Sequence, residues 1–424
     1  MIFFYKILTS FFYPFFILLI YSRTLFNKED KVRFKEKIFL NSISAERDLK
    51  KKLIWFHAAS IGEVQSIFPV IEDLKSKRKN IEFLITTITF SSGDLVKKKI
   101  LNCDYIQHRY LPIDVSFLIK KFLKEWKPNL VIFVDSEIWP NLIFELKKQK
   151  ISLSILNARL TKKTFKRWMM IKRTAKKVFG CFDLCLASDK FTKDSLNKLG
   201  ATNIKFIGNI KFSVPINYKE IFNQNEKILT KKRFWCAVST HKGEEEFCLK
   251  THTIMKKKFK DLMTIIIPRH ISRSNNIKKL CDEKNLTSQV LNDNEEIKKN
   301  KDIIIINSFG VLLKYLKYSK SVFIGKSMIK KIQNDSGQNP IEAAKLSCKI
   351  YHGPYFSNFK EIYNLLSKYK ISEKVNNEKE LTNKLSIDLK NPIKNFSKQI
   401  GVINNFGKKI LKKSTGEIKK IINI

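Results

Sequence analysis

The chain has little glycine and proline, 13 and 10 of its 424 residues, and its seven cysteines contain no CxxC pair. The odd, widely spaced cysteines argue against a disulfide framework or a zinc ribbon and predict reduced, buried thiols in a reducing compartment. No GxxxxGK[ST] or GxGxxG segment is present, which excludes two common phosphate-binding motifs. No pair of histidines has metal-ligand spacing, so the residues predict no metal site.

Acidic residues are scarce beside basic ones, 39 against 82, and the formal net charge is +43. Such a charge favours polyanionic partners, namely nucleic acid, anionic lipid or phosphorylated substrates. Lys, Ile, Asn and Phe are abundant together, as in proteins from AT-rich genomes, and this background accounts for part of the excess. The length and an apolar fraction of 43% predict a globular protein of two domains.

Long apolar stretches are absent except at the amino terminus, where we expect a membrane anchor over residues 1–22. Residues 7–21 are uncharged but reach only about 22 Å as a helix, against a hydrocarbon core of roughly 30 Å. Pro14 interrupts them, and basic residues follow from Arg23, which keeps the rest of the chain in the cytoplasm. The segment is predicted to be a marginal span or a helix in the membrane interface, and the alternative is a buried helix of the soluble body.

After this segment, short apolar runs alternate with lysine-rich amphipathic stretches of helical length. Such alternation predicts parallel sheets with helices on both faces. The pattern pauses near residues 208–216 and restarts, which predicts two Rossmann-like domains, 23–210 and 211–390. A basic helical tail, 391–424, either packs on the first half or lies on a membrane. The expected strands are 53–57, 81–86, 129–135, 151–157, 184–187, 233–240, 262–268, 302–307, 321–325 and 349–353.

The rarest residue types gather where these strands end. In open parallel sheets, ligands bind beyond the carboxyl ends of the strands. Four of the six histidines and six of the 13 glycines follow expected strands, which predicts one cleft between two facing halves. They are His57, His241, His270, His352, Gly62, Gly243, Gly310, Gly325, Gly337 and Gly353.

The segment HAASIGE, residues 57–63, follows the first strand. A turn that brings the backbone close to a ligand favours a residue without Cβ, which explains Gly62. Glu63 then lies in the first turn of a helix, where its carboxylate can take a proton from an attacking hydroxyl. The alternative is that Glu63 only interacts with the helix dipole, and the spacing does not choose between the two.

The second half contains a predicted anion and nucleotide site. Arg269 directly follows a strand and can clamp a phosphate. Gly310 stands at one probable helix start and Pro340 at another. Glu342, in the first turn after Pro340, can accept hydrogen bonds from the two hydroxyls of a ribose. A structural role is the alternative for each residue alone, and their joint placement favours a site.

Nine segments resemble, in order and spacing, the lipopolysaccharide Kdo transferases, which add 3-deoxy-D-manno-octulosonic acid (Kdo) from CMP-Kdo to a lipid A precursor. The resemblance covers nearly the whole chain. The segments are HAASIGE, TTITFSSG, DSEIWPN, NARL, GNIKF, STHKGEE, PRH, SGQNPIEAA and GPYFSNFKEI.

The resemblance implies an inverting glycosyltransferase of α/β, GT-B fold: two Rossmann-like domains facing a central cleft, with an N-terminal membrane-anchor helix. It implies that the first domain binds the acceptor, a lipid A precursor of the lipid IVA type, and that the second binds CMP-Kdo. The expected location is the cytoplasmic side of the bacterial inner membrane. Neither a metal nor another cofactor is expected, and no nucleic-acid partner.

The resemblance also implies residue roles. Glu63 matches the catalytic base, and Asp135 and Lys211 match positions that stabilise the transition state. The chain departs from the family at Asp135 and at Val311, where glutamate is usual, whereas Glu137 matches. The residues that match the CMP-binding positions are Pro268, Arg269, Phe309, Gly310, Val311, Asn339, Pro340, Ile341 and Glu342.

Two alternative functions remain open at this point. The first is a GT-B enzyme that uses another nucleotide sugar, such as a sugar-nucleotide epimerase. The second is a basic, membrane-bound protein that binds polyanions without chemistry. The gathering of rare glycines and histidines at strand ends speaks against the second.

Overall fold

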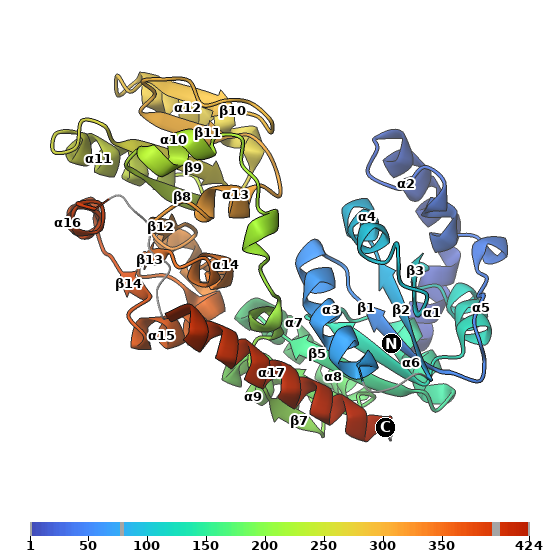
Figure 1. Cartoon of the computed structure of the whole chain (residues 1–424). Helices are drawn as coiled ribbons and strands as arrows, with labels where there is room; N and C mark the ends of the chain where they lie inside the picture. The colour runs from blue at the N-terminus through green and yellow to red at the C-terminus, as the bar shows by residue number, and fades with distance from the viewer. Residues whose placement is uncertain (1, 77–79, 392–398, 423–424) are drawn as a thin grey trace. The chain divides into compact units, whose positions relative to one another are not determined.

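The computed structural model describes residues 2–76, 80–391 and 399–422. Two seven-stranded sheets, all of whose paired strands are parallel, organise the chain (Figure 1), which confirms the predicted two-domain α/β fold. The strand orders are β3-β2-β1-β4-β5-β6-β7 and β10-β11-β9-β8-β12-β13-β14. The chain divides into two compact units, one made of Met1–Pro215 with Phe406–Ile424 and the other of Ile216–Asn405.

The first unit contains the first sheet and the helices between its strands. Its strands are β1 Lys52–His57, β2 Ile81–Thr87, β3 Ile106–Tyr110, β4 Leu130–Val134, β5 Ser152–Ala158, β6 Leu184–Ala187 and β7 Ile204–Phe206. Its helices are α1 Ile2–Phe11, α2 Tyr13–Leu25, α3 Ile61–Lys75, α4 Phe90–Lys99, α5 Ser116–Trp126, α6 Pro140–Lys148, α7 Lys162–Met170, α8 Lys172–Phe179 and α9 Lys190–Leu199. Three short 3-10 helices are η1 Arg33–Lys37, η2 Leu40–Ser42 and η3 Ile210–Ser213.

The second unit repeats this arrangement around the second sheet. Its strands are β8 Phe234–Thr240, β9 Met263–Pro268, β10 Ser288–Leu291, β11 Ile303–Ile306, β12 Ser321–Ile324, β13 Lys349–His352 and β14 Ser372–Lys374. Its helices are α10 Glu226–Lys231, α11 Glu244–Lys256, α12 Ser274–Asp282, α13 Leu312–Leu316, α14 Ile341–Lys345, α15 Lys360–Lys368 and α16 Glu378–Asp388. The 3-10 helices are η4 Tyr218–Glu220, η5 Ile271–Arg273, η6 Lys330–Asp335 and η7 Ser357–Phe359, and α17, Gln399–Ile421, follows.

The ten expected strands are all present, and the four that the sequence did not reveal are the edges of the two sheets. These are β3, β7, β10 and β14. An edge strand is paired on one side only and needs less apolar surface, so its sequence lacks the continuous apolar run of a central strand. In β3, for example, Gln107 and Arg109 alternate with more buried residues.

The amino-terminal segment forms two helices, α1 and α2, that meet at 56°. Among the described residues, no single helix has both the length and the apolar composition of a membrane span. The two helices of this bent pair have them only when taken together. One side of the pair is attached to the first unit, because Tyr5 Oη donates to Asp114 and Asn141 donates to Thr9, both over 3.0 Å. Large apolar side chains on the pair remain exposed, among them Phe3, Phe4, Phe11, Phe15 and Leu18.

Helix α17 packs against η3 of the first unit. The rings of Phe406 and Phe212 meet edge to face at 5.1 Å. At Gly407 the two backbones come so close that an added Cβ would lie 2.1 Å from the carbonyl oxygen of Phe212. The described part of the predicted tail from Phe406 on therefore belongs to the first unit. Residues 392–398 and 423–424 of that tail, like residue 1 of the predicted anchor, lie outside the described residues.

None of the seven cysteines forms a disulfide, and six of them are buried. Burial raises the pKa of Cys185 and of Cys281 to about 12, so both stay as thiols at neutral pH. The expectation of buried, reduced thiols is confirmed for six residues, and Cys103 is only half-buried.

We expect Gly407→Ala to destabilise the protein by about 1–3 kcal/mol, because the added methyl group meets the backbone of η3 and cannot be accommodated without a shift. The matched control is Gly416→Ala in the same helix, where nothing lies within 4 Å of the added Cβ. That substitution should be neutral or stabilising by up to about 1 kcal/mol, since alanine is the better helix former. Urea unfolding measures both, and equal effects would contradict the close packing of α17 on η3.

Candidate active site

Three of the residues expected in the site meet at the carboxyl edge of the first sheet. Glu63 lies in the first turn of α3, after β1, and Asp135 directly follows β4. Lys211 lies in η3, and its Nζ donates to Asp135 Oδ2 over 2.7 Å. The side chains of this ion pair are 22% and 13% exposed, so the pair is partly shielded from water but open to a ligand. Lys211, expected at the start of the second domain, therefore belongs to the first unit.

Glu63 is 8% exposed, and its carboxylate is held from two sides. Ser60 Oγ donates to Oε1 over 2.7 Å, and the Ala59 N–H donates to Oε2 over 2.8 Å. Burial, followed by the negative charge of Asp135, raises the pKa of Glu63, although these two hydrogen bonds lower it. A raised pKa makes the carboxylate a stronger base. Glu63 thus also links Ala59 and Ser60 to the first turn of α3, and its remaining lone pairs can still accept a proton.

Asn157, to which the sequence assigned no role, links three segments: the end of β5, where it stands, the residue after β4, and η3. Its Nδ2 donates to Asp135 Oδ1, and its Oδ1 accepts a hydrogen bond from the Ile210 N–H at 3.0 Å. Asp135 and Asn157 both have φ near 58°, a left-handed conformation that Asp and Asn tolerate better than most residues. The available signal was an asparagine at the end of the strand in the NARL segment.

The second sheet carries the other expected residues at its own carboxyl edge. Pro268 ends β9, and Arg269 is exposed, with no described residue paired to its guanidinium group. Phe309 is 70% exposed and stands beside Gly310, which has φ of 78°, between β11 and α13. Val311 is 4% exposed, so only its backbone can contact a ligand there, in line with the loss of the usual glutamate.

Residues 339–342 lie between β12 and β13, where α14 begins. Asn339 Oδ1 accepts a hydrogen bond from the N–H of Ile341, the first residue of this helix, at 3.1 Å. Pro340 and Ile341 are buried, whereas Asn339 and Glu342 are half-buried and keep polar atoms near the surface. Strands β11, β9, β8 and β12 are neighbours, so the segments that follow β9, β11 and β12 share one edge of the sheet.

Glu244, which the sequence did not single out, organises this edge. It is buried, and its carboxylate accepts hydrogen bonds from four backbone N–H groups. Burial raises its pKa, and the four hydrogen bonds act in the opposite direction. The carboxylate therefore joins the loop after β8 to the loop after β12. The donors are His241 at 3.0 Å, Lys326 at 2.7 Å, Ser327 at 2.8 Å and Met328 at 2.9 Å.

The four histidines at strand ends have different surroundings. His57 and His352 are buried, while the rings of His241 and His270 lie 5.9 Å apart. Burial lowers the pKa of His352 to about 4, so it is neutral at pH 7. Within the part of the chain that the structure describes, no three His, Cys, Asp or Glu side chains are grouped as metal ligands.

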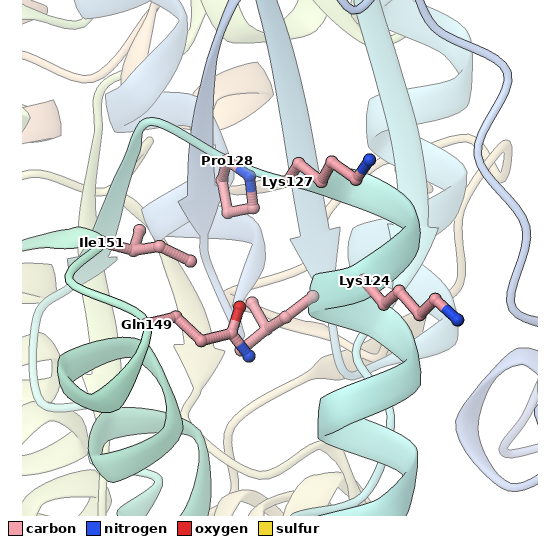
Figure 2. Close-up of a pocket in the computed structure, with 6 residues that line it drawn as sticks. Lys124, Lys127, Pro128, Gln149 and Ile151 are labelled. Carbon is pink, nitrogen blue, oxygen red and sulfur yellow. The ribbon is translucent and has the colours of Figure 1, made fainter.

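An open pocket of about 420 Å³ lies elsewhere, between the end of α5 and the end of α6 (Figure 2). Its residues stand before β4 and β5, at the amino ends of these strands. Asp135 stands after β4, so this pocket and the Glu63 cluster occupy opposite edges of the first sheet. The pocket is lined by Leu123, Lys124, Lys127, Pro128, Gln149 and Ile151.

Comparisons with known structures support the fold. The chain superimposes on UDP-GlcNAc 2-epimerase from Neisseria meningitidis with a TM-score of 0.57 at 13% identity, covering 88% of this chain and 99% of the epimerase. At this identity the likeness establishes a shared fold and leaves the chemistry open.

Comparisons of sequence establish the family. Residues 32–214 match the family described as 3-deoxy-D-manno-octulosonic-acid transferase (kdotransferase). The transferase of that name from Rickettsia bellii is 31% identical over 375 residues, which is 88% of this chain and 87% of the relative. The transferase from Haemophilus influenzae is 28% identical over 377 residues, 88% and 86% of the two chains. The chain therefore belongs to the 3-deoxy-D-manno-octulosonic acid transferases, a family of glycosyltransferases.

Proposed function

We propose that this protein transfers Kdo from CMP-Kdo to a lipid A precursor of the lipid IVA type, with inversion at the anomeric carbon, in lipopolysaccharide biosynthesis. The observation that carries the proposal is the cluster of Glu63, Asp135 and Lys211 in a chain of this family. The cluster offers a shielded base of raised pKa beside a positively charged group, which are the two things that sugar transfer requires.

In the proposed reaction, the Glu63 carboxylate takes the proton from a hydroxyl of the acceptor sugar. The oxygen forms a bond to the anomeric carbon of Kdo while the bond from that carbon to the phosphate oxygen of CMP breaks. CMP leaves with the bonding electrons from the opposite face, so the configuration inverts, as in inverting hydrolases. CMP is a good leaving group, and no strong general acid is needed.

Positive charge stabilises the charge that develops on CMP and the carboxylate of Kdo. Lys211 supplies it in the first unit, and Arg269 supplies it in the second. We assign CMP to the carboxyl edge of the second sheet, which carries the exposed Arg269 and Phe309 and the half-buried Asn339 and Glu342. Glu342 accepts hydrogen bonds from the ribose hydroxyls, and no metal or other cofactor takes part in the proposed reaction.

We further propose that α1 and α2 bind the cytoplasmic side of the inner membrane by lying in its interface. The pair is fixed to the first unit through Tyr5 and Asn141, and it presents exposed phenylalanines on its remaining surface. A helix pair with one side attached to protein and one apolar side exposed fits the boundary between headgroups and acyl chains. The excess of basic residues adds attraction to anionic lipid, roughly 1 kcal/mol for each Lys or Arg near the surface.

The first test of the function is product analysis. Wild-type protein is incubated with a lipid A precursor and either CMP-Kdo or a uridine-linked sugar. The mass of the lipid product is then measured by mass spectrometry. The proposal is supported if the lipid gains the mass of Kdo in the reaction with CMP-Kdo and gains no mass with the uridine-linked sugar. Transfer or epimerisation of the uridine-linked sugar alone would replace it by the alternative nucleotide-sugar function.

Glu63→Gln should lower kcat by about 10²–10⁴-fold, because the amide cannot take the hydroxyl proton. In the wild type, the apparent pKa of the acid limb in the plot of kcat/KM against pH should lie above the ordinary range of glutamate. The reason is that the Glu63 carboxylate must be ionised to act as the base, and its pKa is raised. The control is Glu72→Gln, which changes an exposed residue of the same helix. It should keep full activity and the wild-type pH dependence. Near-normal turnover of the folded Glu63→Gln protein would remove Glu63 as the base.

Lys211→Met should lower kcat by about 10²–10³-fold, because the substitution removes positive charge from the site. Lys205→Met changes an exposed lysine of β7 and serves as the control, with unchanged rates expected. Thermal unfolding of both variants measures how much stability is lost when Asp135 no longer has its ion pair, so this loss can be told apart from a loss of catalysis. Equal kcat values for the two variants would contradict the assigned role.

Replacing Phe4 and Phe11 with serine should weaken co-sedimentation with vesicles that contain anionic lipid by about tenfold or more, since each fully inserted apolar side chain contributes about 1.5–3 kcal/mol. The matched control is Phe222→Ser, which changes a 70% exposed phenylalanine of the second unit and should leave binding unchanged. Unaltered binding of the double variant would contradict the interfacial location of α1 and α2.

A further inference from the structure

His57 is a buried residue with a polar atom that finds no partner. The side chain is 0% exposed, and its Nδ1 lies 2.9 Å from Thr86 Oγ1. Its Nε2 has no hydrogen-bond partner among the described residues. That atom points toward Glu137, whose Oε2 lies 3.7 Å away, just beyond hydrogen-bond length. Buried polar atoms are nearly always satisfied, so the direction of Nε2 needs an explanation.

The neighbours of His57 indicate which ring nitrogen carries the proton. The indole N–H of Trp55, which can only donate, donates to Thr86 Oγ1 over 2.8 Å. The hydroxyl proton of Thr86 is then available for Nδ1 of His57, which leaves the ring proton on Nε2. The opposite tautomer would direct a lone pair at the Glu137 carboxylate. We therefore assign Nε2–H as a donor that faces Glu137.

The packing of the ring keeps this donor in place. Phe133 contacts the His57 ring edge to face at 5.8 Å, and Trp139 does so at 6.1 Å. The His57 side chain is thus fixed between β4 and the loop that follows it. A side chain fixed by packing and by the hydrogen bond at Nδ1 is suited to orienting another group.

Glu137 has one oxygen that is held and one that is open. Its Oε2 accepts a hydrogen bond from the indole N–H of Trp139 at 3.1 Å and faces His57. No described residue donates to its Oε1, and the side chain is 24% exposed. Glu137 follows β4 and Glu63 follows β1, and these two strands are neighbours in the sheet, so both carboxylates lie at the same edge of the sheet. Burial and the charge of Asp135 are the main causes that raise the pKa of Glu63, and the charge of Glu137 acts in the same direction.

We propose that Glu137 binds a hydroxyl group of the acceptor sugar through Oε1, and that His57 is the positioning residue that orients the Glu137 carboxylate. This inference rests on the proposed function, because the acceptor is the hydroxyl-bearing molecule that reaches Glu63. A carboxylate oxygen accepts hydroxyl protons in charge-assisted hydrogen bonds, about twice as strong as neutral ones. One carboxylate then takes the proton of the reacting hydroxyl while its neighbour orients the sugar that carries it.

The first variant is Glu137→Gln, which keeps an acceptor oxygen for Trp139 and loses the charge. The KM for the lipid acceptor should rise about tenfold or more, because a neutral acceptor replaces a charged one. The KM for CMP-Kdo and the thermal midpoint should stay close to the wild-type values. If the role of Glu137 were only structural, the substitution would instead lower the thermal midpoint and change both KM values alike.

A second pair of variants tests the positioning role. His57→Asn keeps a polar atom near the position of Nδ1 and loses the donor that faces Glu137, whereas His57→Gln places an amide N–H near the position of Nε2. We expect His57→Asn to raise the acceptor KM as Glu137→Gln does, and His57→Gln to restore it. Combining His57→Asn with Glu137→Gln should add little to either single effect, since both act on one contact.

The second unit supplies a matched control in His252. This residue is also 0% exposed, its Nδ1 lies 2.8 Å from Thr264 Oγ1, and its Nε2 also lacks a described partner. His252→Asn should therefore lower stability about as much as His57→Asn and leave the acceptor KM unchanged.

An unchanged acceptor KM in Glu137→Gln, or equal acceptor KM values in His57→Asn and His252→Asn, would overturn this inference while the wild type still transfers Kdo. Failure of the wild type to transfer Kdo would overturn the proposed function and this inference with it.

Discussion

The ion pair between Asp135 and Lys211 connects separate stretches of the chain in one site. Asp135 follows β4, Lys211 lies in η3, and Asn157 at the end of β5 contacts both segments. Because the pair is only partly exposed, its charges interact more strongly than they would at a free surface. Asp135 also acts on Glu63, whose pKa is raised first by burial and then by the negative charge of Asp135. The proposed acid-base chemistry thus depends on where η3 is held.

The central part of each sheet could be predicted from the sequence, and its edges could not. Runs such as residues 53–56 and 303–306 are apolar at every position, because a central parallel strand is covered on both faces. The edge strands β7 and β14 contain three residues each, and so short a segment has no periodicity to read. The long-range pairing that makes them strands is set by the neighbouring strand and not by their own residues.

The position of the site was predictable because strand ends are marked in the sequence, while its internal contacts were not. Glu63 lies in the first helical turn after an apolar run and Arg269 directly follows another, and in each sheet such residues stand at the edge where the parallel strands end. The links made by Asn157 and Glu244 depend on left-handed backbone and on loops that meet from distant parts of the chain. Likewise, the orientation of His57 follows from its contacts with Thr86, Phe133 and Trp139, which no local pattern reveals.

The contact between Gly407 and Phe212 has a consequence for synthesis on the ribosome. The first unit takes its last segment, Phe406–Ile424, from the very end of the chain, after the whole second unit has been translated. In a nascent first unit, the η3 surface therefore stays uncovered until α17 has left the exit tunnel. A chain that stops shortly before Phe406 would keep every described strand of both sheets and still expose the backbone beside Lys211.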